Sequence, residues 1–177
     1  DELVESGFVK VFESESAAMA HLGGHQPVSS KLAMVKVTKD GVTKCRLILD
    51  CRVSGTNDAS ERFERVLLPK CWDVVRDEMD LKRRCRDQEG LYLFVLDFKD
   101  AFYMLPLLDE EQRFFTAYHG GRWYIWQRIA QGSLNGPNAF GRLASLTARM
   151  TQGMMDPSTT RLQLYTDDPC TVLRGTE

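Results

Sequence analysis

The apolar positions of this 177-residue chain fall in short runs that are divided by glycine, proline and polar residues. Two such runs, 32–38 and 44–50, are rich in strand-forming residues and flank Asp40-Gly41, a pair that predicts a β-hairpin with a two-residue turn. Successive side chains of a strand point to opposite faces, so Arg46 and Cys45 are expected on different faces of this hairpin.

Two further hairpins are predicted downstream. Residues 114–118 and 123–129 form one, and the alternating runs 161–164 and 170–173 form another around Tyr165-Thr166-Asp167-Asp168. The last hairpin therefore carries two adjacent acids at its tip. Neighbouring carboxylates repel each other, and either solvent or a bound cation relieves the repulsion. A solvated turn and a cation site are both open at this point.

Residues 91–96 form a nearly continuous apolar run that is too short for a helix and predicts a strand buried on both faces. The run ends at Asp97. A buried carboxylate without compensation costs several kcal/mol or becomes protonated, so a metal ion at this strand end would account for the acid.

Three helices are expected between the strands. They run from 14 to 22, from Pro69 to Lys82-Arg83-Arg84, and from Pro137 to about Met150. The second helix carries apolar residues at helical spacing. The third carries an apolar stripe, and we interpret the methionines at its end and just beyond it as core filler. These residues are Trp72, Val75 and Met79, and then Phe140, Leu143, Ala144, Met150, Met154 and Met155.

Composition narrows the class of protein. The chain is 43% apolar and 27% charged, which suits a globular unit with a core, and no apolar run approaches the length of a membrane span. Five cysteines without a Cys-x-x-Cys pair argue against zinc and disulfide frameworks and favour an intracellular setting, the cytoplasm or the nucleus. Residues 31–52 carry six basic and two acidic residues, so this hairpin is either an ordinary solvated element or a phosphate-facing surface.

Four stretches, in this order, resemble the sequence boxes of reverse transcriptases, the RNA-directed DNA polymerases of retroviruses and retrotransposons. The resemblance covers about residues 32–173. The stretches are the basic hairpin 44–52, the strand end Asp97 to Tyr103, the loop from Gln131-Gly132 to Gly136-Pro137, and the Tyr-x-Asp-Asp box at 165–168.

The resemblance implies an α+β right-hand polymerase fragment, with fingers, most of an antiparallel palm sheet, and no thumb. Residues 1–90 and 107–136 would be fingers, with a boundary in the polar break 86–90. Residues 91–106 would be a palm strand, and 137–177 the palm helix and acidic hairpin. The chain would then belong to a longer polyprotein with a thumb and, as further candidates, RNase H and integrase domains.

The resemblance also implies roles for individual residues. Asp97 and Asp167 would hold two Mg²⁺ ions, for which Mn²⁺ can substitute, with Asp168 as an accessory acid and the Phe98 carbonyl as a further ligand. The aromatic ring of Phe102 would select deoxynucleotides by excluding a 2′-hydroxyl. The partners would be dNTPs and an RNA or DNA template-primer. The expected nucleotide-binding residues are Lys39, Arg46, Asp100, Ala101, Phe102, Gln131 and Gly132.

Some residues depart from the family pattern. Cys45 stands where many relatives have an aromatic residue, Lys99 where a small one is common, and Pro169 removes a backbone donor directly after the acid pair. Two alternatives are a viral RNA-directed RNA polymerase and a polymerase-like domain that binds RNA or protein without catalysis. Thr166 and Phe102 count against the first, and the presence of all three acids counts against the second.

Overall fold

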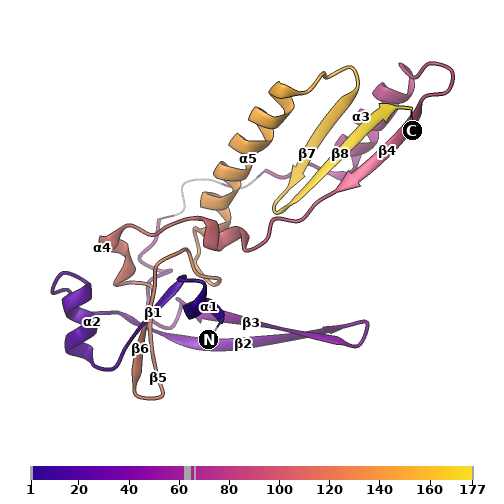
Figure 1. Cartoon of the computed structure of the whole chain (residues 1–177). Coiled ribbons are helices and arrows are strands. Elements are labelled where there is room, and N and C mark those ends of the chain that lie inside the picture. Colours follow the sequence, from indigo (N-terminus) through magenta and orange to yellow (C-terminus); the bar gives the residue numbers. More distant parts are fainter. Residues whose placement is uncertain (1, 62–64, 66, 177) are drawn as a thin grey trace. The chain divides into compact units, whose positions relative to one another are not determined.

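The computed structural model describes residues 2–61, 65 and 67–176, and the side chains of Lys39 and Lys44 lie outside the described residues. The chain divides into two compact units, which are drawn together in Figure 1. The first unit is Asp1–Phe63 with Phe102–Gly136, and the second unit is Glu64–Ala101 with Pro137–Glu177. Each unit is therefore built from two separate stretches of sequence.

The first unit contains a five-stranded sheet in the order β1-β6-β5-β2-β3. All neighbours are antiparallel except β2 and β5, which pair in parallel over a short stretch. The strands are β1 (Val9–Phe12), β2 (Ser29–Lys39), β3 (Val42–Asp50), β5 (Thr116–His119) and β6 (Arg122–Trp126), and the helices are α1 (Glu2–Glu5), α2 (Glu15–His21) and α4 (Asp109–Gln112).

Turn chemistry explains the two predicted hairpins of this unit, and both are confirmed. Asp40 and Gly41 have φ values of 52° and 77°, and Gly120 and Gly121 have 57° and 81°. Positive φ at both turn positions is the geometry that two-residue hairpins favour. The hydrophobic core of this unit includes Val9, Leu49 and Trp126, and each of these side chains is no more than 3% exposed. The predicted first helix is also confirmed, with the Ser14 hydroxyl accepting from the Ala17 N–H.

The second unit contains a three-stranded antiparallel sheet in the order β4-β8-β7. Its elements are α3 (Cys71–Lys82), β4 (Gly90–Val95), α5 (Gly136–Met154), β7 (Thr160–Tyr165) and β8 (Asp168–Gly175). A 3₁₀ turn, η1 (Ala101–Met104), begins at the last residue of the first stretch of this unit. Helix α3 packs against all three strands. The side chain of Gln152 on α5 bonds the backbone of Thr160 and Leu162 on β7, so α5 is tied to the other edge of the sheet.

Several sequence-based predictions of burial are wrong. The 91–96 run forms β4, but β4 is an edge strand, and Leu93, Phe94, Val95 and Leu96 are 51–64% exposed. The stripe of Trp72, Val75 and Met79 is exposed, while Asp77 and Leu81 are the buried residues of α3. Met150 and Met154 are 62% and 88% exposed, so they do not fill a core. Pro69 precedes the helix and its N-cap, Lys70, instead of opening the first turn.

The chain passes from one unit to the other between residues 63 and 64, between 101 and 102, and between 136 and 137. The polar break 86–90 instead lies inside the second unit, where it connects α3 to β4. No helix in the described part of the chain is long and apolar enough to cross a membrane.

Candidate functional site

The acidic hairpin forms as the alternating pattern predicts. Strands β7 and β8 pair from Thr160 opposite Leu173 up to Tyr165 opposite Asp168, which leaves Thr166 and Asp167 as the two-residue turn. Thr166 has a φ of 56°, a left-handed value that is uncommon for a β-branched residue. The turn therefore presents Asp167 at the tip and Asp168 at the first position of β8.

Backbone hydrogen bonds bring Asp97 to this hairpin. The Leu96 N–H donates to the Pro169 carbonyl and the Phe98 N–H to the Asp167 carbonyl, each at 2.9 Å. Asp97 lies between these two bonds and thus opposite Asp168 in the antiparallel register. Directly opposed residues of an antiparallel pair project on the same face, at Cα separations of about 4.5–5.5 Å. Two acids far apart in sequence are therefore neighbours on one face of the sheet.

Two features hold the strand end that carries Asp97. The Phe98 ring packs edge-on against Phe140 of α5, with ring centroids 6.0 Å apart, and Phe140 is 2% exposed. Pro169 has no N–H, but its carbonyl still accepts from Leu96 on the β4 side. Leu164 of β7 still pairs with Pro169, and Tyr165 with Asp168, so Pro169 does not disrupt the hairpin.

The burial argument for a metal at Asp97 is wrong, because Asp97 is exposed and lies beyond an exposed edge strand. Asp168 is also exposed, and Asp167 is partly buried. Among the described residues, no three His, Cys, Asp or Glu side chains gather closely enough to hold a metal ion. The fit to Mg²⁺ thus rests on carboxylate oxygens, which this ion prefers, and on backbone placement. The ligand set stays a prediction.

The segment after Asp97 turns sharply. Strand β4 ends at Val95, Asp100 has a φ of 57°, and the 3₁₀ turn η1 begins at Ala101, so the chain turns within a few residues of Asp97. Phe102 is partly buried and belongs to the first unit, whereas Asp100 and Ala101 belong to the second. The predicted gate residue is therefore the first residue of the second stretch of sequence that belongs to the first unit.

In the first unit, Arg46 lies on β3 opposite Val35 and is exposed. The register places Lys39 opposite Val42 at the hairpin end, but its side chain is outside the described residues. Arg52 is already engaged, because its guanidinium lies 3.0 Å from the Asp50 carboxylate and its hydrogen bond lowers the pKa of Asp50. The basic residues of 31–52 are therefore not all available to an anion.

The glycine loop is fixed to β3. The Leu49 N–H donates to the Gln131 carbonyl at 2.9 Å, and Gly132 has a φ of 111°. A Cβ atom on Gly132 would lie 2.1 Å from the Leu49 carbonyl oxygen, so no other residue fits without a shift. The glycine allows a close backbone approach, as predicted, and here the approaching group is strand β3.

Sequence reasoning missed the residue that holds this loop. The Asn57 amide donates to the Gly132 carbonyl at 3.0 Å, and its oxygen accepts from the Leu134 N–H at 2.9 Å. Asn57 lies in a loop more than 70 residues earlier. Its amide can donate and accept at once, but nothing in the local sequence indicates the partner.

Comparison with solved structures identifies the architecture. A foamy viral protease-reverse transcriptase bound to double-stranded DNA matches all of this chain over 25% of its own length, with a TM-score of 0.60 and 18% identity. The prototype foamy virus enzyme gives a TM-score of 0.57 and 20% identity, again over all of this chain and 19% of its own.

The fold is reverse-transcriptase-like. No family model and no curated protein matches the chain. The chain spans between about a fifth and a quarter of the length of these two reverse transcriptases, and at this identity the likeness establishes the reverse-transcriptase-like fold alone.

Proposed function

We propose that this chain is part of an RNA-directed DNA polymerase, with fingers and palm elements that add dNTPs to a primer 3′-hydroxyl. The observation that carries the proposal is the placement of Asp97 opposite Asp168, beside the Tyr165-to-Asp168 hairpin, within a reverse-transcriptase-like fold. Fingers would correspond to the first unit, and the palm to the second.

The acids of the second unit would hold the metal ions. Asp97 and Asp167 would bind two Mg²⁺ ions, with Asp168 and the Phe98 carbonyl as further oxygen ligands. Bound Mg²⁺ would supply Lewis-acid activation of the primer hydroxyl and charge neutralisation of the triphosphate. The chain's own part is positioning: Phe98 is fixed by its N–H and by its ring, so the backbone next to Asp97 is held in place.

Residues of the first unit would bind the incoming nucleotide. Arg46 offers a planar fork and Lys39 a point charge for the triphosphate. Gln131 is held on β3 through its carbonyl, so its side chain extends from a fixed backbone. The N–H groups of Asp100 and Ala101 would meet phosphate oxygens, and the Phe102 ring would lie under the sugar.

A template-primer is the proposed macromolecular partner. Two of the similar structures are complexes with double-stranded DNA, which supports nucleic-acid binding by this fold. The whole activity would use domains beyond the quarter that this chain matches, a thumb among them.

Primer extension tests the proposal in the natural polypeptide that contains this segment, on RNA and DNA templates with dNTPs or NTPs. Asp97→Asn is expected to lower dNTP incorporation at least about 10²-fold, because a metal ligand is weakened. Asp58→Asn, in an exposed loop, is the matched control and should retain activity. Wild-type-like extension by a folded Asp97→Asn protein contradicts the proposal.

The two alternatives give different outcomes in the same assay. Preferential use of NTPs on RNA would indicate an RNA-directed RNA polymerase. Template binding with no extension by the unmodified protein would indicate a domain that has lost catalysis.

Phe102→Ala tests the sugar gate within an active polypeptide. The ratio of deoxy- to ribonucleotide incorporation should fall, because the 2′-hydroxyl no longer meets the ring. Phe98→Leu removes a ring four positions earlier in the sequence and should leave the ratio unchanged, even if total activity decreases. An unchanged ratio in Phe102→Ala would contradict the role of Phe102 in excluding the 2′-hydroxyl. It would not affect the proposed metal ligands.

A further inference from the structure

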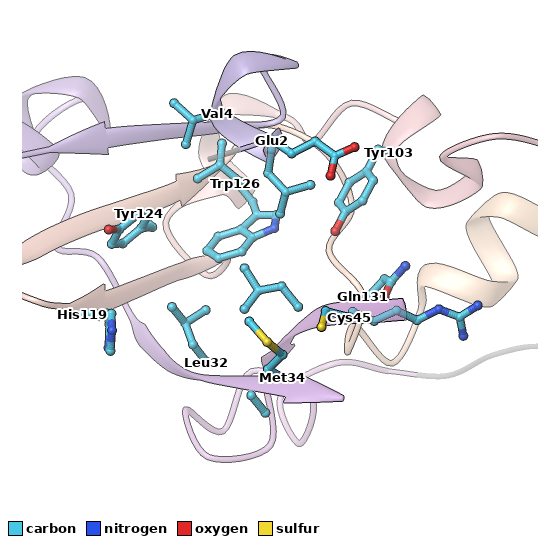
Figure 2. Close-up of a pocket in the computed structure, with 15 residues that line it drawn as sticks. Glu2, Val4, Leu32, Met34, Cys45, Tyr103, His119, Tyr124, Trp126 and Gln131 are labelled. Carbon is cyan, nitrogen blue, oxygen red and sulfur yellow. The ribbon is translucent and has the colours of Figure 1, made fainter. Parts of the chain in front are cut away.

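A pocket of about 610 Å³ lies wholly within the first unit (Figure 2). Small-molecule sites in proteins typically measure about 300–1,000 Å³ and combine apolar walls with a few polar groups. The walls come from α1, β1, β2, β3, β5 and β6, and from the segments that carry Tyr103 and Gln131. Its volume and its mixture of apolar and polar lining residues therefore fall within the range of small-molecule sites.

The floor of this pocket is preformed. Trp126 and Tyr103 are 2% and 8% exposed and belong to the hydrophobic core of the unit, and Tyr124 packs against that core. The Tyr103 ring is also stacked on Phe8, with centroids 4.9 Å apart. Trp126 and Tyr103 are thus almost fully covered and support the floor, whereas the partly exposed ring of Tyr124 is the aromatic surface that a flat ligand can contact without first being ordered.

The opposite wall is one face of the β2–β3 hairpin. Leu32 and Met34 on β2 lie opposite Leu49 and Leu47 of β3. Cys45 lies two positions before Leu47 on the same strand, so these side chains share a face. Met34 is 59% exposed and Cys45 is exposed, which leaves this side of the pocket open to solvent. Figure 2 shows Cys45 among the lining side chains, with Gln131 as a polar group of the same pocket.

We propose that this pocket binds a small aromatic ligand with one polar end, and that the Cys45 thiol stands at its rim. The ligand would pack on Tyr124, Leu32 and Met34, whose side chains are accessible, and its polar end would meet the Gln131 amide. Arg46, the proposed triphosphate contact, lines the same pocket, so a bound ligand is expected to reduce dNTP binding. This last consequence, reduced dNTP binding, rests on the proposed function, whereas the pocket does not.

The cysteines of the chain provide an internal comparison. Cys45 and Cys71 are both free and exposed, but Cys71 begins α3 in the second unit and does not line the pocket. Cys51 is buried, and burial raises its thiol pKa, so it should react slowly. A reagent that first binds the pocket should therefore favour Cys45 over Cys71.

The test compares N-(2-naphthyl)maleimide with N-methylmaleimide. In both, the thiolate sulfur adds to the alkene, one C–S bond forms as the π bond is lost, and the carbanion takes a proton from water. Peptide mass spectrometry gives the rate ratio of Cys45 to Cys71 for each reagent. We expect the ratio to be at least tenfold higher for the naphthyl reagent. Equal ratios for the two reagents overturn the proposal.

Met34→Trp provides a second, independent arm. Met34 is exposed, so the larger ring is tolerated, and it should occupy the pocket. The naphthyl preference for Cys45 should then disappear, while labelling by N-methylmaleimide continues. A preference that survives in folded Met34→Trp overturns the assignment to this pocket.

The link to nucleotide binding is tested separately. Fluorescent dNTP binding is compared before and after naphthyl labelling in a Cys71→Ser background. Weaker binding after labelling supports the link. Unchanged dNTP binding after complete labelling removes the link and leaves the pocket in place. Failure of the proposed function is recognised differently, by the absence of any dNTP binding to the unlabelled protein.

Discussion

Gly132 shows how one residue can satisfy a pattern for an unexpected reason. The resemblance to reverse transcriptases assigns it to the border of the nucleotide, yet the structure places the Leu49 carbonyl where its Cβ would be. Both its φ of 111° and this contact exclude a side chain. The requirement for glycine was therefore predictable from the sequence, but the backbone it approaches was not.

Gly132→Ala should destabilise the first unit by about 2–4 kcal/mol, because it adds left-handed strain to a steric clash with backbone. Urea unfolding followed by Trp fluorescence measures the change. Gly153→Ala is the matched control, since Gly153 has ordinary φ and open space around its Cβ position on α5. This control should be neutral or stabilising by up to about 1 kcal/mol. Equal stabilities of the two variants would contradict the role given to the Leu49 contact.

Thr166 is strained at the tip of the acidic hairpin. Asn tolerates its left-handed conformation better than a β-branched residue does, so Thr166→Asn should stabilise the second unit by about 0.5–1 kcal/mol. The same change at Thr38, in strand β2, should be destabilising because Asn is a poor strand former. Thermal unfolding of both variants checks the opposite signs.

At the scale of elements, the sequence patterns predicted which helices and strands form better than they predicted which of their residues are buried. The 91–96 run and the Trp72, Val75 and Met79 spacing each predicted the correct type of element. Their exposure was not predictable, because it depends on which elements flank them in space. β4 lies at the sheet edge, and α3 buries the other side of its helix. The hairpins were predicted more fully, since their turn residues specify the pairing locally.

The connection between α3 and β4 is held by an ion pair that should respond to acid. Glu89 accepts from the Arg86 N–H and pairs with Arg174 of β8 at 3.2 Å. The backbone hydrogen bond, followed by Arg174, lowers the pKa of Glu89. Since the folded pKa lies below the unfolded one, the unfolded state binds more protons. The stabilisation is present above the ordinary glutamate pKa and is lost as the pH falls through the folded value.

Glu89→Gln should therefore reduce the acid sensitivity of the second unit. The measurement is the urea midpoint between pH 7 and pH 3, which should fall less steeply in the variant than in the unmodified chain. Arg174→Gln keeps the Arg86 donor and should give an intermediate slope. Identical slopes in all three proteins would show that this ion pair does not contribute.

At the scale of the whole molecule, β4 carries four consecutive exposed apolar residues, Tyr92, Leu93, Phe94 and Val95. An edge strand with unpaired backbone groups and apolar side chains on both faces is prone to pair with another strand. Leu93→Lys should lower self-association of this chain, measured as apparent mass against concentration by light scattering. Leu146→Lys adds the same charge to exposed α5 and should have a smaller effect. Equal effects would indicate that net charge, and not the strand edge, controls association.

The reverse-transcriptase-like fold was predictable at this scale, because four local sequence boxes appear in order along one chain. The metal-binding role of the three acids stays a prediction. The placement of Asp97 depends on long-range strand pairing between β4 and β8, which no local pattern specifies. The same applies to the amide of Asn57 and its partners around Gly132. What the sequence left undetermined was which distant segments contact each other.

The interleaving of the two units bears on synthesis. Residues 1–63 cannot complete their sheet until β5 and β6 follow, and the ribosome must first deliver residues 64–101, which belong elsewhere. At about 5–20 residues per second, the amino-terminal hairpin waits several seconds for its partners. During that interval its unpaired edge is exposed to the crowded interior of the cell, so nascent chains of this design should depend on chaperones more than a contiguous domain of equal size.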